Sequence, residues 1–418
     1  MAAWASGFRT FPMTANPRAV RLLLGCAVLA AALAMGIRQS FGLFLAPMTG
    51  ELGWSASGFA LAIALQVLIN GIAQPVCGQV ADRIGGRPVI AGGALLYALG
   101  ILGMALSASL FWFTFFAGVV MGVAVSAAGM PVIIASLTRL LPEAMRGRAV
   151  GLGTAGSSFG QFLVVPLSQA GIALAGWQGA LFLLAGAALL MAPLALPLAD
   201  RPAPPAAGQP EQTARAALAT ALRAPAFWCL FLGFFVCGLH VSFLAVHLPG
   251  FVASCQLPAA VGAGAIALIG LFNILGSLAA GELAQRWRRR DLLVVIYAAR
   301  GVLMAGFLMA EKTAASVLVF SVLMGVLWLS TVPPTVALVA RNFGTRWLAT
   351  IFGLVFLGHQ IGGFAGAFLG GVIFDATGSY DLMWSLCIAA AAFAALVHLP
   401  VPDRLPLAPA ARAATSRR

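Results

Sequence analysis

The sequence has very little charge. Asp, Glu, Lys and Arg make up 8% of its 418 residues, whereas soluble domains carry about 25%. Apolar residues account for 61% of the chain. So few charged side chains cannot cover the surface of a chain of this length in water, which excludes a water-soluble globule. We therefore expect lipid to surround most of the protein.

Patterns of catalysis and metal binding are also missing. The six cysteines show no CxxC or other metal-ligand spacing, and neither HExxH nor the phosphate-binding P-loop pattern occurs. A sensor would need an output domain, and an intramembrane enzyme would need an acid, a base, a nucleophile or a metal constellation. We expect no enzyme activity, no cofactor and no metal site.

Long apolar runs fill most of the chain. A helix needs about 20 residues to cross about 30 Å of hydrocarbon, and the runs lack the two-residue alternation of barrel strands. We predict an all-α membrane protein with twelve transmembrane helices, at about residues 20–45, 57–79, 88–108, 111–138, 147–174, 179–198, 226–248, 260–283, 291–310, 315–340, 348–373 and 383–400.

The longest polar stretch divides these helices into two sets of six. It is rich in proline and suits a flexible connector. We predict an N-terminal half over 1–198, a connector over 199–225, a C-terminal half over 226–400 and a tail over 401–418. If the N-terminus is cytoplasmic, 21 of the 24 Lys and Arg residues lie on the cytoplasmic side, as positive charge does in membrane proteins. The net charge of +13 is then a topology signal, and nucleic-acid binding is not expected.

The two halves repeat at an offset of 202 or 203 residues. GIRQSFGLFLAP from Gly36 matches GLHVSFLAVHLP from Gly238. Each half has an even number of spans, so the repeat is parallel. We expect its axis to run along the membrane normal, with a substrate site near the midplane between the halves.

Two cytoplasmic motifs carry a family resemblance. GQVADRIGGR from Gly78 and PEAMRGRAVG from Pro142 are similar to the loop signatures of the major facilitator superfamily. The first helix, GSSFGQ from Gly156 and FDATGSY from Phe374 resemble the branch of monocarboxylate porters and oxalate:formate exchangers. The branch implies transport of small organic anions by alternating access. Its usual Asp and Arg in helix 8 are replaced here by Asn273 and Ser277, which argues against proton coupling through such a pair.

The resemblance also implies a cytoplasmic gate. Such gates are charge clusters that stabilise one conformer. The motif residues that would form this one are Asp82, Arg83, Arg87 and Arg146. The C-terminal repeat has Gln285 where the N-terminal repeat has Asp82, so we expect the two halves to hold this conformer with unequal strength.

Arg38 is the leading candidate for substrate binding. It lies nine residues before Pro47, which is roughly 14 Å along its helix and too deep to reach the membrane surface easily. A charge at this depth needs a partner or a wet cavity. A guanidinium matches a carboxylate because it donates two parallel hydrogen bonds. The alternative is a structural arginine bound to the backbone of a neighbouring helix.

His240 is the repeat equivalent of Arg38. We expect it to face Arg38 at equal depth, where it could bind an anion or carry a coupled proton, unless it is an ordinary packed histidine. Five further residues could line the site, although each has a packing role as its alternative: the interhelical hydrogen-bonding pair Asn70 and Asn273, His359 and Gln360 beside a GxxxG, and the aromatic Trp328. Arg300 also lies inside a span, where it either contacts substrate or bonds within its own half.

All eleven acidic residues fall at helix ends or in loops. No carboxylate is therefore expected at mid-membrane, and a cavity that contains Arg38 should favour an anion. We predict a carrier of a small organic anion, such as a monocarboxylate, that uses a coupled proton or a counter-anion. We expect a monomer in the lipid bilayer of a bacterial inner membrane, with both termini cytoplasmic. The alternative is an exporter of amphipathic or drug-like compounds.

Overall fold

The structure is a computed structural model that describes residues 17–200, 214–344 and 347–402, with side chains described except at 17, 143–144, 146–150, 214–216 and 349. Every regular element in these ranges is helical, which confirms the predicted all-α class. The helices before the connector are α1 (Pro17–Gln39), η2 (Phe41–Phe44), α2 (Leu45–Leu52), α3 (Ala56–Ile84), α4 (Gly86–Leu106), α5 (Leu110–Thr114), η3 (Phe115–Val120), α6 (Met121–Ala128), α7 (Met130–Leu140), α8 (Glu143–Leu189) and α9 (Met191–Leu194).

The remaining helices are α10 (Ala214–Arg223), α11 (Pro225–Ser254), α12 (Ala259–Arg286), α13 (Arg289–Met309), α14 (Ala314–Leu327), α15 (Val332–Phe343), α16 (Leu348–Thr377) and α17 (Asp381–His398). Helix α10 lies inside the stretch for which we predict a flexible connector, so at least ten of its residues are helical.

Eleven helices of the described chain are long and apolar enough to cross a membrane. One of them contains two predicted spans, because α8 runs through both the fifth and the sixth. Its backbone leaves the helical region at Gly176, with φ 70° and ψ 174°, a conformation that glycine adopts without steric cost. The two parts of α8 on either side of Gly176 therefore correspond to two crossings, and the twelve predicted spans are accounted for.

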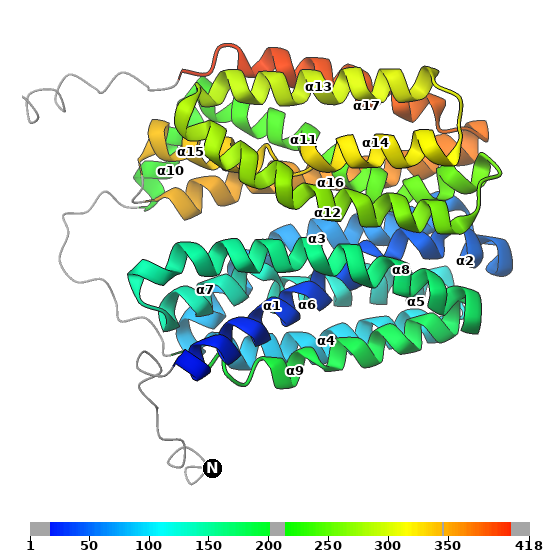
Figure 1. The fold of residues 1–418 in the computed structure, drawn as a ribbon, viewed down its shortest axis with the longest axis horizontal. Coiled ribbons are helices and arrows are strands. Elements are labelled where there is room, and N and C mark those ends of the chain that lie inside the picture. The colour runs from blue at the N-terminus through cyan, green and yellow to red at the C-terminus, as the bar shows by residue number, and fades with distance from the viewer. Residues whose placement is uncertain (1–16, 201–213, 345–346, 403–418) are drawn as a thin grey trace, which may run out of the picture.

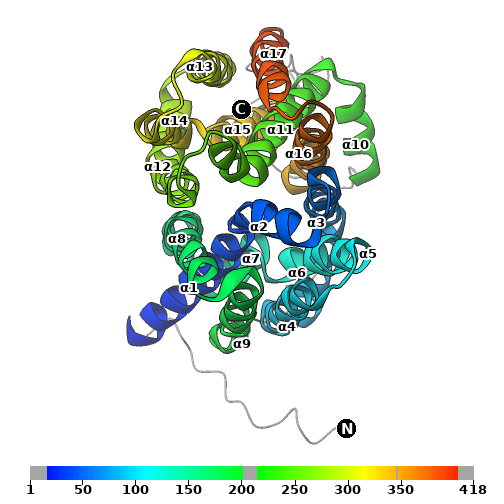
Figure 2. The same ribbon diagram turned by 90° about the vertical axis from the view of Figure 1, so that its right-hand side faces the viewer.

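The helices form two bundles that lie side by side. Figure 1 shows α1 to α9 in one bundle and α10 to α17 in the other, and Figure 2 shows the same division from one end. We call the end at which α1 and α11 begin the connector end, and the opposite end, where α3 and α12 begin, the far end. Each bundle has its own apolar packing, but the largest cluster of buried apolar side chains includes residues from both, such as Phe44 and Phe243.

Several spans are interrupted near their middle. The fourth breaks at Gly129, between α6 and α7, and its repeat equivalent breaks at residues 328–331, between α14 and α15. Proline stands at the start of both second segments, as Pro131 and as Pro333. Proline has no backbone N–H, so the first turn of a helix is where it fits best. These breaks leave polar backbone groups inside the bundles, which need partners there.

Candidate functional site

The two bundles meet along two pairs of antiparallel helices, α3 with α16 and α8 with α12. At the far end of the first pair, the carboxylate of Asp375 accepts hydrogen bonds from the backbone N–H groups of Ala56 (3.0 Å) and Ser57 (2.8 Å). These groups open α3, where free N–H groups and the helix dipole favour a negative charge. Nearby, Gly42 lies so close to the carbonyl of Ala245 in α11 that no larger residue fits.

A glutamine packs on a glycine in each helix pair. Gln360 of α16 lies against Gly71 of α3 and donates to the Val67 carbonyl at 2.8 Å. The second pair repeats the contact with the halves exchanged, because Gln161 of α8 lies against Gly270 of α12 and donates to a carbonyl at 2.8 Å, that of Ile266. In each case the carbonyl belongs to the residue four positions before the glycine.

Two buried asparagines extend these contacts to the broken helices. Asn70 accepts from Gln360 Nε2 (2.9 Å) and donates to Ser126 Oγ in α6 (3.1 Å). Asn273 donates to Ser158 Oγ in α8 (3.0 Å) and accepts from the N–H of Leu329 (3.1 Å), inside the break before α15. Asn70, Asn273 and Gln360 therefore each form a hydrogen bond with the opposite half, and these bonds hold the helices of the two halves together.

The halves separate toward the connector end. Gly78 lies seven residues after Gly71, and Gly353 seven residues before Gln360. Both therefore lie on the faces of α3 and α16 that contact each other at Gly71 and Gln360. Among the described residues outside the glycine's own stretch of helix, no heavy atom lies within 4 Å of the position that a Cβ would take at either glycine. Gly151 and Gly281 show the same open space on α8 and α12. The first helix pair is thus packed at the far end and in the middle, the second pair is packed in the middle, and both pairs are apart at the connector end.

Arg38 lies near the middle of the first span, which covers Arg18–Leu52. Its side chain is half-buried, and Tyr97 of α4 is near enough to interact with it electrostatically. The Tyr97 hydroxyl itself donates to the Ala34 carbonyl at 2.7 Å. Among the residues that the structure describes, none forms a hydrogen bond or an ion pair with the Arg38 guanidinium. The neighbouring Gln39 donates to Gln161 Oε1 at 3.2 Å.

His240 is packed inside its own half. The side chain is 1% exposed, Nε2 lies 2.9 Å from the Cys387 carbonyl of α17, and Nδ1 has no partner in the described chain. Arg300 is close enough to act on it electrostatically. Its position along the repeat is that of Arg38, but its ring is buried between α17, where Cys387 lies, and α13, where Arg300 lies.

Arg300 bonds within the C-terminal half, the second of the two outcomes considered for it. It is 1% exposed, and its guanidinium donates to the carbonyls of Leu327 (Nε, 3.1 Å) and Trp328, where α14 ends. Trp328 itself is 1% exposed. An indole buried to this degree packs within its half in this conformation, and its ring offers no open face for stacking.

His359 lies between aromatic rings. It stacks on Phe356, with centroids 5.5 Å apart and an interplanar angle of 6°, and it also contacts Phe234 of α11. Its Nδ1 is 3.2 Å from Oε1 of Gln360, and the ring is close enough to the thiol of Cys237 to act on it electrostatically. This residue therefore links the glutamine at the contact between the halves to the interior of the C-terminal half.

The charge cluster at the connector end differs from the expected one. Asp82 pairs with Arg139 of α7, whose Nη1 is 2.7 Å from Oδ1. Arg139 Nε also donates to Asp200, which in turn accepts from the N–H of Gly86. The Asp200 side chain is fully buried. Asp82, Arg139 and Gly86 belong to the N-terminal half, and Asp200 stands at the start of the connector, so this cluster ties the N-terminal half together and does not reach across.

The remaining predicted gate residues lie at the edge of this cluster or outside it. Arg87 has a partner in the structure, and Arg83 ends α3 as an exposed side chain. The side chain of Arg146 lies outside the described residues. Sequence reasoning missed Arg139 and Asp200. A signal for Asp200 was present, since a carboxylate directly after an apolar run can accept from the start of a neighbouring helix.

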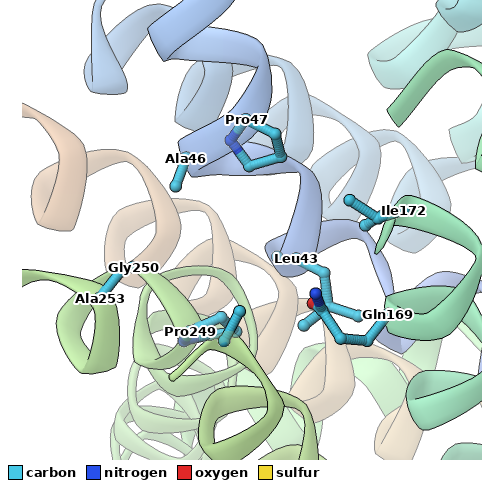
Figure 3. Close-up of a pocket in the computed structure, with 10 residues that line it drawn as sticks. Leu43, Ala46, Pro47, Gln169, Ile172, Pro249, Gly250 and Ala253 are labelled. Carbon is cyan, nitrogen blue, oxygen red and sulfur yellow. The ribbon is translucent and has the colours of Figure 1, made fainter. Parts of the chain in front are cut away.

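A small hollow opens between the halves at the far end. Figure 3 shows that η2, α2 and α8 line it on one side and α11 on the other. It contains the repeat-related prolines Pro47 and Pro249, and Gln169 is the single polar side chain among its lining residues. The hollow offers no charged group for binding an ion.

Comparisons with known proteins agree with this architecture. The family model described as Major Facilitator Superfamily matches residues 27–367. This chain therefore belongs to the major facilitator superfamily of membrane transporters, which are not enzymes. Its similarity to the uncharacterized MFS-type transporter YcxA of Bacillus subtilis (strain 168) is 25% identity over 379 residues, covering 87% of this chain and 90% of the relative.

Two other similarities cover most of the chain. Monocarboxylate transporter 11 of Mus musculus is 28% identical over 386 residues, which cover 90% of this chain and 85% of the relative. Among solved structures, a bacterial homolog to the human lysosomal transporter Spinster, described as inward-facing and unoccupied, matches with a TM-score of 0.72 and 15% identity, over 94% of this chain and 100% of that one. At that identity the match demonstrates the shared fold.

Proposed function

We propose that this transporter moves a small organic anion, specifically a monocarboxylate, and that Arg38 binds its carboxylate. The observation that carries the proposal is that the Arg38 guanidinium, at mid-span and half-buried, has no described partner. A cation held at this depth needs an anion or water. The acidic residues stand at helix ends or in loops, which leaves the substrate as the compensating charge. Similarity to relatives such as monocarboxylate transporter 11 supports the same class.

The asymmetric packing between the halves supports an alternating-access mechanism. If the connector end is cytoplasmic, as the distribution of Lys and Arg favours, the open ends at Gly78 and Gly353 make this an inward-open conformer. The Spinster homolog, whose structure is titled inward-facing, has a similar overall fold. Binding of an anion to Arg38 would bring the halves together around it and allow the far-end contacts to part.

Coupling and location complete the proposal. We propose that transport is coupled to a proton or exchanged for a second anion, with His240 as a proton-carrying candidate because its Nδ1 has no partner in the described chain. Asn70, Asn273, Gln360, His359 and Trp328 then control closure around the substrate and do not bind it in this conformer. We place the protein, as a monomer, in a bacterial inner membrane with cytoplasmic termini, and the cluster at Asp82 on the cytoplasmic side as a gate.

The test compares Arg38→Gln and Arg38→Lys with the unmodified protein. Thermal unfolding of each is measured with monocarboxylates, dicarboxylates, aromatic acids and neutral amphiphiles, followed by uptake into proteoliposomes. A ligand at 100 times its dissociation constant stabilises a protein by about 2.7 kcal/mol. We expect one class of acids to stabilise the unmodified protein, with the effect lost in Arg38→Gln and reduced in Arg38→Lys, which keeps the charge without the two-pronged geometry.

The control variant is Lys312→Gln, because Lys312 lies in the far-end loop and donates to backbone carbonyls. It should bind and transport as the unmodified protein does. Stabilisation of all variants by neutral amphiphiles, and by no acid, would reject the anion carrier in favour of an exporter of drug-like compounds.

A further inference from the structure

Arg300 is a buried cation without a carboxylate. Its guanidinium donates to the carbonyls of Leu327 and Trp328, and Nη1 donates to Cys237 Sγ at 3.6 Å. These carbonyls are neutral, and among the described residues no Asp or Glu forms an ion pair with Arg300. An uncompensated charge inside a membrane protein is costly, and such charges pair with other side chains or with water.

Cys237 is the acidic group that touches this cation. The thiol is fully buried and lies 3.2 Å from Thr331 Oγ1, inside the break before α15. His359 of α16 is close enough to act on it electrostatically. The other titratable groups around it are Tyr297, next to Arg300 on α13, and His240 one turn along α11. Burial opposes ionisation of the thiol, whereas adjacent Arg and His side chains counteract this effect because they stabilise a thiolate.

We propose that Cys237 is the counter-ion of Arg300 and forms, with His359, a reversible proton-binding site inside the C-terminal half. In the deprotonation step the Sγ–H bond breaks, the proton forms an N–H bond on His359, and the electron pair stays on sulfur beside Arg300. The imidazolium then releases this proton to water, because His359 keeps 8% of its surface exposed whereas Cys237 has none. Reprotonation follows the reverse order.

The position of the site connects its charge to the contact between the halves. His359 also bonds to Gln360, which packs on α3 of the opposite half. The break before α15 contacts the site at both ends, because Arg300 donates to the Leu327 and Trp328 carbonyls and Thr331 contacts Cys237. A change of charge at Cys237 therefore acts both on the contact with α3 and on the break before α15. Only this last step, coupling to transport, depends on the proposed function, because the charge on sulfur can be measured on the purified protein alone.

The first experiment reads the S–H stretching band of the purified protein by infrared spectroscopy. An ordinary cysteine, with a pKa of about 8.5, keeps its proton at a pH of about 7 and shows this band. The matched control is Cys387→Ser, since Cys387 is also fully buried but only the burial acts on its thiol. The difference spectrum of Cys387→Ser should contain an S–H band, whereas that of Cys237→Ser should contain none until the sample is acidified.

A second variant keeps the test valid if Cys237→Ser folds poorly. In it Cys237 is the sole cysteine, and the other five are serine. This protein should show no S–H band at neutral pH and should gain one when Arg300→Gln is added, because the cation that stabilises the thiolate is then lost. An S–H band from Cys237 at neutral pH in the sole-cysteine protein would overturn the proposal.

The last measurement tests coupling. In proteoliposomes, Cys237→Ser should transport substrate down its own gradient but lose most of its stimulation by a pH gradient, whereas Cys387→Ser should keep both. If Cys237 is a thiolate and the pH gradient has equal effects on both variants, then the proton site exists but is not coupled, and the claim of coupling fails. If neither variant transports any acid while the spectra are as expected, it is the anion carrier that fails and not the proton site.

Discussion

Asn70 Oδ1 accepts a hydrogen bond from Gln360 Nε2 at 2.9 Å, and this bond joins the two halves of the transporter at mid-span. Its repeat equivalent joins Asn273 to Ser158, at 3.0 Å. Each asparagine also bonds to the broken helix of its own half. Rearrangement of either bond therefore also acts on a broken span, on the fourth through Ser126 or on the tenth through Leu329. Movements of the halves and of these two spans are thus linked.

Removal of one asparagine should destabilise the protein through the group that it leaves unpaired. In Asn273→Ala the N–H of Leu329 loses its partner inside the break, and a buried unsatisfied group costs about 1 to 3 kcal/mol. Ser277→Ala is the control, because Ser277 only donates to the same Asn273 oxygen from a partly buried position. Denaturant unfolding in detergent measures both. Equal stability of the two variants would contradict the role of Asn273 in holding the break.

A side chain at Gly71 should push the halves apart. A Cβ there would lie 2.7 Å from Gln360 Cγ and 2.8 Å from its Cβ, too near the backbone for a rotamer change to relieve. Gly78→Leu is the matched control, on the same face of α3 but in open space. We expect Gly71→Leu, and not Gly78→Leu, to lengthen the distance between spin labels at Gly50→Cys and Ala376→Cys. An unchanged distance distribution in Gly71→Leu would refute the close packing of this pair.

The two aspartates bound to Arg139 should differ in their importance. Asp200 has a fully buried carboxylate, whereas the Asp82 side chain is 61% exposed. Exposed pairs contribute about 0 to 1 kcal/mol, and removal of one partner of a buried pair costs about 3 to 5 kcal/mol. Asp200→Asn should therefore lower the unfolding free energy by about 3 kcal/mol and Asp82→Asn by less than about 1 kcal/mol. Denaturant titration of both variants decides this, and a larger loss in Asp82→Asn would be the contrary outcome.

Cysteine labelling tests which end of the bundle faces out. Cys255 lies in the far-end turn after α11, and Arg288, exposed before α13, lies at the connector end. In a background without the other cysteines, a membrane-impermeant maleimide added to intact cells should label Cys255 and not Arg288→Cys. Burial raises the pKa of the Cys255 thiol, so less of it is thiolate at neutral pH and its labelling should accelerate as the pH is raised. Labelling of Arg288→Cys alone would reverse the proposed orientation.

The sequence by itself determined the class of protein and the internal symmetry. Twelve apolar runs with hardly any charge can be stable only as helices in lipid. The sequence shows this directly because hydrophobicity is a local property of each run. The repeat between Gly36 and Gly238 was readable for the same reason, since matched letters need no knowledge of contacts. A lone charge such as Arg38 was identifiable because its cost depends on depth, which follows from its position along a helix.

Only the tertiary structure decided which side chains meet. Arg38 and His240 occupy equivalent positions in the repeat, yet Arg38 has no described partner whereas His240 bonds to Cys387, 147 residues away. The partner of Asp82 is Arg139 and not a residue of its own loop. Helix rotation and the angles between helices set these pairings, and both depend on the packing of the whole bundle. Local residue patterns indicate which groups need a partner, and the packing of the helices determines which residue that partner is.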